Sequence, residues 1–548
     1  MKKCLRVLLI VVSILLFTDT SQAKKKLKVF IFAGQSNMVG SDSNVKAIDT
    51  FPPFVGYGKK QEANMFYYSI GRERKFESDN WESLNPVNHV VGPEISFARK
   101  VSTSINEPVA IIKCAAGGTH LGGDWNPDKP SGFKMYPLAL NLVKSALNEL
   151  KKKNIEYEIE GFMWHQGEND MFNEDYMNNY GDNLENFLKR WREDLGKPGL
   201  KFYIGELCTK TIWGMDLRPR MYAISKGQRQ VTESDSLAKY IPTAHIGVEI
   251  GGGVGLHYHY GTLGQLQHGL NYANAYLSSL GQAENELRKL NEWPYPKNST
   301  VKLFIMAGHR NMEGERAFTQ DITKRKDQEL LLKDNLGVAY KYSLGGGYKV
   351  SKGWEPLGVV NYYDSFGPEL SFGSFLDKKN IGDFAIAKFT HSGSQIIDWT
   401  PDGSVAKSRN LYEKFINFVK ESISEIRKKG NKVRLEGIFY HIGENDMSFG
   451  PHRTNAPSWI KTIVEQSRKD LENEKLNWYL SQQSPTDDKS VNKIDVVSEV
   501  ERIVRDDMHL FHIKNFNLVP QVKKLVISSE GIIQLGEFLG DFYLKRSQ

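Results

Sequence analysis

The chain has 548 residues, of which 40% are hydrophobic and 25% are charged, a composition that excludes a disordered or fibrous protein. Its 72 basic and 65 acidic residues leave a net charge of +7 over this length, so we do not expect a nucleic-acid-binding protein. Three cysteines exclude a disulfide scaffold.

The first 23 residues predict a cleaved signal peptide. Lys2, Lys3 and Arg6 precede an apolar run over 7–17, and the segment closes with small residues at Ser21 and Ala23. The run is about half of the roughly 20 apolar residues that a membrane span needs, and no later segment is long and apolar enough to cross a membrane. We therefore expect a secreted or periplasmic protein without a membrane span.

The predicted mature chain keeps two cysteines, Cys114 and Cys208. They could pair in an oxidising compartment. Both lie near the ends of strand-like apolar runs, which favours two buried free thiols.

Short apolar runs alternate with amphipathic stretches along the mature chain. Strands are predicted over 28–33, 109–113, 161–164 and 201–204, and helices over 92–102, 137–152 and 183–195. This alternation predicts the α/β class, with a parallel sheet covered by helices on both faces. In such folds the active site lies beyond the carboxyl ends of the strands.

Several sequence blocks return in the same order later in the chain. GQSNM at 34–38 returns as GHRNM at 308–312 (310 − 36 = 274), and GFMWHQGENDM at 161–171 returns as GIFYHIGENDM at 437–447 (437 − 161 = 276). Trp81 and the block GPEISF at 92–97 return as Trp354 and GPELSF at 367–372. These repeats predict two homologous halves. We place the first domain at 24–290, a linker at 291–300 and the second domain at 301–548.

Ser36 lies between a predicted strand and a predicted helix. A serine hydroxyl is a weak nucleophile, so it needs a base and hydrogen-bond donors for the developing oxyanion. His259 can serve as the base, with His257 as the alternative. The oxyanion donors are expected among residues that follow predicted strands: Ser36, Gly117, Gly118, Gln166 and Asn169.

Together these blocks resemble the sialate O-acetylesterase domain, a member of the family 6 carbohydrate esterases within the SGNH hydrolases. The resemblance rests on GQSNM at 34–38, GGT at 117–119, WHQGE at 164–168 and a histidine before a Gly-rich helix, and it extends over both halves. It implies two tandem flavodoxin-like α/β/α domains and removal of acetyl groups from sugars without a metal or cofactor. Ser36 matches the nucleophile, and His259 matches the base because Gly264 and Gly269 follow it at the family's spacing.

The sequence offers several candidates for the third member of the triad. Many SGNH enzymes place an aspartate three residues before the histidine, where this chain has Leu256. We predict that Glu168 takes this role, with Asp170 and Glu249 as alternatives. Glu168 could instead be a structural carboxylate, because the second half repeats it as Glu444.

Three further residues are predicted to contact the substrate: Gln35, Trp125 and Asp170. For Trp125 the alternatives are a sugar platform, a lid and core packing. Gly117 and Gly118 could serve packing alone. His165 recurs as His441 and is interpreted as structural.

The second half is predicted to have lost its chemistry. Arg310, Ile442 and Val526 stand where the first half has Ser36, Gln166 and His259. Arg310 could pair with Glu444 or Asp446, or bind the carboxylate of an acidic sugar.

The sequence therefore predicts a carbohydrate O-acetylesterase that is active in its first half. Sialic acid, xylan and other acetylated glycans remain open as substrates. A non-hydrolytic binding protein for acetylated glycans is the alternative, and a serine hydrolase for lipid or peptide esters is a third. The two halves are expected to pack on each other.

Overall fold

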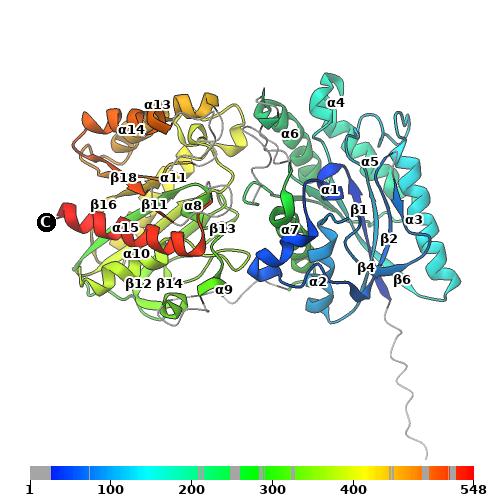
Figure 1. The fold of residues 1–548 in the computed structure, drawn as a ribbon, viewed down its shortest axis with the longest axis horizontal. Coiled ribbons are helices and arrows are strands. Elements are labelled where there is room, and N and C mark those ends of the chain that lie inside the picture. Colours follow the sequence, from blue (N-terminus) through cyan, green and yellow to red (C-terminus); the bar gives the residue numbers. More distant parts are fainter. Residues whose placement is uncertain are drawn as a thin grey trace, which may run out of the picture.

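Each half of the chain is built around its own eight-stranded sheet (Figure 1). The computed structural model describes residues 26–72, 75–207, 211–212, 215–246, 259–282, 288, 290–322, 328–443, 446, 450–483, 493–515, 517–518 and 526–547. The predicted signal peptide and Cys208 lie outside these residues.

The first sheet has the strand order β10-β7-β6-β1-β5-β2-β3, with β4 also paired to β2. Its strands are β1 (Leu27–Gly34), β2 (Gln61–Ile70), β3 (Phe76–Glu77), β4 (Glu82–Leu84), β5 (Val109–Ala115), β6 (Tyr157–His165), β7 (Phe202–Gly205) and β10 (Ala238–Ile241). All pairs from β10 to β2 are parallel, whereas β3 and β4 run antiparallel to β2. The prediction of parallel strands is thus confirmed for the centre of the sheet. At its edge, β3 and β4 are antiparallel to β2, because short turns can join only antiparallel strands.

Helices cover both faces of this sheet. They are α1 (Ser36–Val39), α2 (Glu94–Ile105), α3 (Met135–Lys152), α4 (Glu174–Asn178), α5 (Tyr180–Asp194), α6 (Arg218–Ser234) and α7 (Gly261–Ser279), with short 3₁₀ turns at Val45–Thr50, Pro52–Phe54 and Asp170–Phe172. Side chains of α3, α5 and α6 share one apolar core with the sheet, and those of α2 and α7 share the other. Alternate residues of β1 enter the two cores: Val29 and Ile31 enter one, Phe30 and Phe32 the other.

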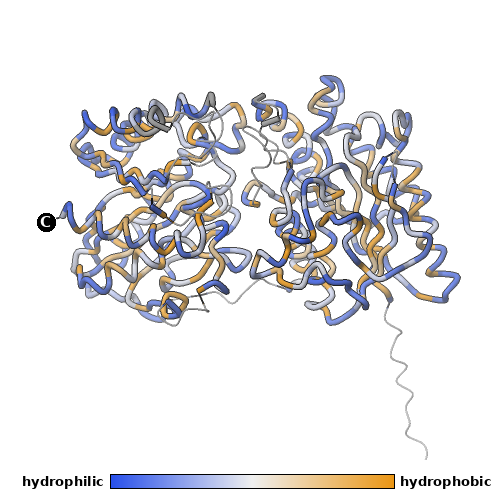
Figure 2. The backbone as a smooth tube through the Cα atoms, viewed as in Figure 1, coloured by the Kyte–Doolittle hydropathy of each residue, from blue (hydrophilic) through white to orange (hydrophobic). Residues whose placement is uncertain are grey.

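The second half repeats this architecture in the order β13-β12-β15-β11-β16-β17-β18, with β14 paired to β12. Its strands are β11 (Thr300–Gly308), β12 (Asn335–Leu344), β13 (Lys349–Val350), β14 (Glu355–Leu357), β15 (Phe384–Thr390), β16 (Lys432–His441), β17 (Trp478–Gln483) and β18 (Leu510–Asn515). Its helices are α8 (Arg310–Glu313), α9 (Thr319–Ile322), α10 (Glu369–Lys378), α11 (Tyr412–Lys428), α13 (Gly450–Asp470), α14 (Lys493–Arg505) and α15 (Ser529–Ser547). The predicted three-layer α/β/α fold is therefore confirmed for both halves, and Figure 2 shows hydrophobic stretches along their inner strands.

A buried ion pair recurs at the same place in the two sheets. Lys113 of β5 lies 2.7 Å from Glu94 of α2, and Lys388 of β15 lies 2.7 Å from Glu369 of α10. Burial lowers the pKa of Lys113, while the neighbouring Glu94 carboxylate opposes that shift. Because both halves keep the pair, it belongs to the fold and not to the chemistry of one half.

Candidate active site

Ser36 begins helix α1 immediately after strand β1. The chain turns sharply at Gly34, whose φ is 152°, and a Cβ built there would lie 2.0 Å from the His165 carbonyl oxygen. Only glycine can occupy this position, so the turn depends on it. Ser36 itself is half-buried, which leaves its side chain within reach of a ligand.

The ends of β5 and β6 bring hydrogen-bond donors close to Ser36. A Cβ built on Gly117 would lie 3.5 Å from the Ser36 Cβ, and one built on Gly118 would lie 3.8 Å from Nδ2 of Asn169. Within the described residues, the Gly117 N–H and Asn169 Nδ2 have no hydrogen-bond acceptor. The structure therefore brings these segments together at one edge of the sheet, as the sequence predicted.

Arg72 is a residue at this edge that sequence reasoning missed. Its guanidinium lies 3.0 Å from the Cβ position of Gly118, and it sits 4.9 Å from the ring centroid of Phe133. No motif marks an arginine in a turn between two edge strands, so only the three-dimensional structure brings it to this site.

Gln166 and Gln35 form a buried network behind Ser36. Nε2 of Gln166 donates to Gln35, Asp170 and the Thr119 carbonyl oxygen, at 3.1, 2.5 and 2.9 Å. Oε1 of Gln35 also accepts the Gly167 N–H at 3.1 Å. Both side chains are buried, at 0% and 1% exposure. Gln166, predicted as an oxyanion donor, and Gln35, predicted to contact substrate, are placed to brace the loop after β6.

Two other residues predicted to contact substrate are also enclosed. Trp125 has no exposed surface, donates to Thr119 Oγ1 at 3.0 Å and packs edge-on against Trp164. Asp170 accepts hydrogen bonds from the N–H groups of Leu121 and Gly122 at 2.9 and 3.0 Å. Burial raises the pKa of Asp170, although these hydrogen bonds oppose the rise. Of the three alternatives for Trp125, the structure favours core packing. Asp170 lies where a structural carboxylate would lie.

His259 lies just before α7, with 12% of its side chain exposed. Its Nδ1 lies 2.6 Å from a carboxylate oxygen of Asp42, a residue 217 positions earlier in the chain. Sequence reasoning missed Asp42, because no spacing rule relates it to His259. His257, Glu249 and Leu256 lie outside the described residues.

Glu168, predicted to orient His259, has different neighbours. Its Oε1 accepts from Asn37 Nδ2 at 2.6 Å and lies 3.4 Å from Nε2 of His165. Burial raises the pKa of Glu168, but His165 and Asn37 outweigh this and hold the pKa below its ordinary value. Asn37 Oδ1 accepts the Tyr260 N–H at 3.2 Å, and His165 packs edge-on against the Tyr260 ring, so Glu168 reaches the histidine segment indirectly, through Asn37 and His165.

The corresponding edge of the second half is filled by its own side chains. Arg310, 2% exposed, pairs with the equally buried Glu315 at 2.9 Å. Asp446, one of its expected partners, instead accepts the Ile396 N–H at 3.0 Å, and Glu444 lies outside the described residues. With the guanidinium enclosed in this way, the structure gives no support to binding of a sugar carboxylate by Arg310.

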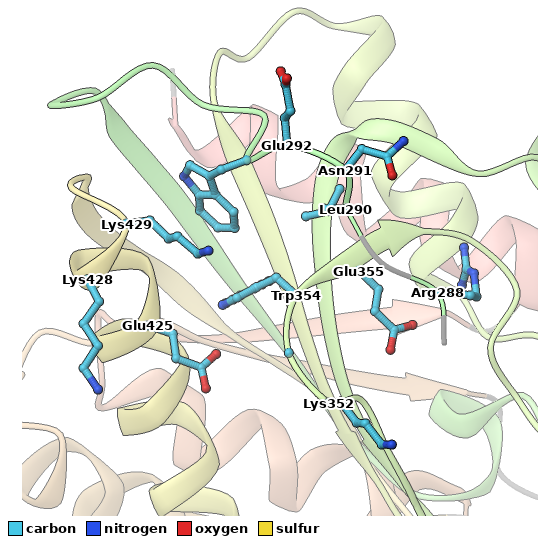
Figure 3. Close-up of a pocket in the computed structure, with 12 residues that line it drawn as sticks. Arg288, Leu290, Asn291, Glu292, Lys352, Trp354, Glu355, Glu425, Lys428 and Lys429 are labelled. Carbon is cyan, nitrogen blue, oxygen red and sulfur yellow. The ribbon is translucent and has the colours of Figure 1, made fainter. Parts of the chain in front are cut away.

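A separate cavity of about 500 Å³ lies between the second half and the segment before it. Figure 3 shows Trp354 at its centre, with Lys429 on one side, Glu355 on the other and Glu425 beneath. None of the residues predicted for catalysis lines this cavity. The candidate active site is therefore the Ser36 edge of the first sheet.

Three further observations concern metal binding, membrane-spanning helices and free thiols. Across the described ranges, no group of three or more histidine, cysteine, aspartate or glutamate side chains is arranged to hold a metal ion. In the same part of the chain, no helix combines the length and apolar character needed to cross a bilayer. Cys114 is a buried free thiol, and burial raises its pKa to about 12.

Comparison with known proteins identifies the family of the chain. The sequence of the chain matches "Probable carbohydrate esterase At4g34215" of Arabidopsis thaliana with 26% identity over 193 residues, which is 32% of this chain and 66% of that protein, just under two thirds of its length. The X-ray structure of the Arabidopsis protein aligns with 21% identity over 46% of this chain and 99% of its own, with a TM-score of 0.36. NanS aligns with 14% identity over 47% of this chain and 98% of its own, with a TM-score of 0.35.

The carbohydrate acetylesterase XAC1771 of Xanthomonas citri aligns with 15% identity over 47% of this chain and 58% of its own, with a TM-score of 0.34. The family whose sequence model matches is described as "Carbohydrate esterase, sialic acid-specific acetylesterase". The match covers residues 26–278 and again residues 300–545, which together make up most of the chain. The chain therefore belongs to this carbohydrate esterase family, with two tandem copies of the family's domain.

Proposed function

We propose that this protein is a secreted carbohydrate O-acetylesterase that works through an acyl-enzyme on Ser36. One observation supports the proposal most strongly. A half-buried serine at the start of a helix lies near the Gly117 N–H and Asn169 Nδ2, two donors without an acceptor among the described residues. His259 completes the set, because its neighbour Tyr260 is hydrogen-bonded to Asn37, the residue after the serine.

The proposed reaction has two steps. The Ser36 hydroxyl attacks the acetyl carbonyl carbon while His259 takes its proton, and the oxyanion accepts from the N–H groups of Ser36 and Gly117 and from Asn169 Nδ2. The intermediate collapses, and the sugar alkoxide leaves with the proton from His259. Water then attacks the acetyl-serine with His259 again as the base, which releases acetate and restores the serine. The chemistry needs no metal or cofactor.

The proposed substrate is an acetylated glycan, such as sialic acid, xylan or another acetylated polysaccharide. Membership of the family supports this class, and Arg72 beside Gly118 adds a positive charge at the site. Secretion rests on the predicted signal peptide over 1–23. The alternative function, non-hydrolytic binding of acetylated glycans, is favoured by the missing aspartate at Leu256.

For the second half we propose the role of a non-catalytic packing partner. Its Tyr348 ring stacks on His245 of the first half at 3.6 Å, and its Tyr348 and Tyr363 hydroxyls both donate to Asn271 of α7. Arg218 of α6 donates to Gln395 at 2.6 Å. These contacts support a fixed arrangement in which the second half braces the elements on either side of the His259 segment.

The test of the proposed function is acetate release by the purified mature chain from a panel of acetylated glycans. We expect release from at least one glycan, full activity after exhaustive chelation, and covalent labelling of the serine by a fluorophosphonate. The full-length Ser36→Ala variant should lose labelling and at least about three orders of magnitude in rate, since the second half has Arg310 at the position of the serine. Residual hydrolysis above about a tenth of the wild-type rate would show that Ser36 is not the nucleophile.

Binding of acetylated glycans without acetate release would favour the alternative function. Matched melting temperatures for the wild-type chain and Ser36→Ala would show that the substitution removes chemistry and not the fold.

A further inference from the structure

The Asp42–His259 contact joins the two segments that carry the predicted nucleophile and base. Asp42 Oδ2 lies 2.6 Å from Nδ1 of His259, and its side chain is 68% exposed. Asp42 comes six residues after Ser36, in the turn that ends α1. The N–H groups of Gly40 and Ser41 both donate to the Ser36 carbonyl oxygen at 3.0 Å, which reverses the chain there.

The backbone of Asp42 is held in an uncommon conformation. Its φ is 61°, in the left-handed region that non-glycine residues rarely adopt. Aspartate and asparagine tolerate this region better than other non-glycine residues. Such a conformation persists only where the surroundings hold it.

Two hydrogen bonds hold the segments together on either side of the contact. On one side, Asn37 Oδ1 accepts the Tyr260 N–H at 3.2 Å. On the other, the Asn44 N–H donates to Oγ1 of Thr262 at 2.8 Å. Asp42 and His259 therefore stay side by side without depending on their own contact.

The second half keeps both flanking bonds. Asn311 Oδ1 accepts the Ile527 N–H at 2.9 Å, and the Phe318 N–H donates to Oγ of Ser529 at 3.0 Å. Asn311 and Phe318 match Asn37 and Asn44 (311 − 37 = 274, 318 − 44 = 274), while Ile527 and Ser529 match Tyr260 and Thr262 (527 − 260 = 267, 529 − 262 = 267).

The residues between these bonds differ in the second half. Arg316 and Val526 stand where the first half has Asp42 and His259 (316 − 42 = 274, 526 − 259 = 267). The half that has lost its serine has thus kept the scaffold and lost both members of the pair. That difference points to a chemical role for the pair, because a scaffold contact would have been retained with its neighbours.

We propose that Asp42 is the positioning carboxylate of His259, in the role that the sequence analysis gave to Glu168. The inference rests on the proposed function, in which His259 is the base. An ionised carboxylate only accepts hydrogen bonds, so Nδ1 of His259 carries the proton and Nε2 carries the lone pair that takes the Ser36 proton. Asp42 also stabilises the imidazolium that forms during attack.

The expected effect is smaller than in a buried triad. Removal of a buried triad aspartate lowers kcat by about 10⁴-fold, but the carboxylate of Asp42 is largely exposed, and water screens its charge. We expect Asp42→Asn to lower kcat for 4-nitrophenyl acetate by about 10- to 100-fold, with KM within about twofold. Asparagine tolerates the left-handed backbone, so the melting temperature should not change.

The experiment compares Asp42→Asn, Asp42→Glu and Asp79→Asn in the full chain. Asp79 is an exposed aspartate in the turn between β3 and β4, so its change removes the same charge elsewhere in the first half. Asp42→Glu should recover part of the rate, and Asp79→Asn should behave as the wild type. A kcat within about twofold of the wild type for Asp42→Asn would overturn the proposal, as would a matching loss for Asp79→Asn.

Two readouts separate this inference from the proposed function. The rate of fluorophosphonate labelling follows the serine and its base with no sugar substrate, and it should fall with kcat in Asp42→Asn. Nitrogen-15 NMR of histidine-labelled protein, with His259 assigned through His259→Gln, should show the Nδ1–H tautomer. A wild-type chain that neither labels nor hydrolyses would overturn the proposed function and with it the role of His259 as base. An Nε2–H tautomer in a chain that labels and hydrolyses would overturn the role of Asp42 alone.

Discussion

Replacement of Glu168 by glutamine tests whether this carboxylate braces the site or acts on the base. The side chain is 4% exposed and holds Asn37, which in turn holds the Tyr260 N–H. A hydrogen bond to a charged group contributes about 1.5–3 kcal/mol, and a neutral one about 1 kcal/mol. Because the amide oxygen can still accept from Asn37, we expect a loss of about 1–2 kcal/mol.

That loss corresponds to a lower melting temperature. A domain of 150–250 residues loses about 2–4 °C for each kcal/mol, so Glu168→Gln should melt about 2–8 °C below the wild type at pH 7. The pKa of Glu168 is held below its ordinary value in the folded chain. Its contribution to stability is therefore complete above the unfolded-state pKa and is lost as the pH falls through the folded-state pKa. The difference between wild type and variant should shrink below about pH 4.

Scanning calorimetry at pH 7 and at about pH 3, with kcat for 4-nitrophenyl acetate at pH 7, provides the assay. Glu168 contacts Asn37 and His165, whereas His259 contacts Asp42, so kcat should fall by less than about tenfold. The exposed carboxylate of Glu62 supplies a control, because Glu62→Gln should leave both the melting temperature and kcat unchanged. A fall in kcat of more than about 100-fold with no change in melting temperature would refute a bracing role.

Two other substitutions test the site and its counterpart in the second half. Asn169→Ala should lower kcat by about 10²- to 10³-fold, because it removes a proposed oxyanion donor; an unchanged kcat would exclude this role. The same change removes Oδ1, which accepts from the buried Gln35 Nε2 at 3.4 Å, so a loss of about 1 kcal/mol in stability should accompany it. Arg310→Ala should destabilise the second half by about 3–5 kcal/mol, because it leaves Glu315 buried without its partner. Calorimetry checks this second expectation, and a melting curve that matches the wild type would contradict it.

The duplication, the layered fold and the place of the site all follow from patterns in the amino-acid sequence. The repeats of GQSNM and GENDM established two copies. Alternating apolar runs and amphipathic stretches established parallel strands between helices, because each pattern exposes one face and buries the other. The carboxyl ends of parallel strands meet at one edge, so the sequence pattern predicted that the segments of Ser36, Gly117 and Asn169 lie together, as they do in the structure.

The contacts of each side chain, in contrast, depend on the packed fold. Asp42 and His259 are 217 positions apart, and no local pattern encodes a contact that depends on how a turn packs against a distant helix. Glu168 and Trp125 carry the residue types expected of an active site, but the fold turns one toward Asn37 and His165 and encloses the other in the core. Burial and partners are properties of the packed chain, because neighbours from several strands and helices create them together.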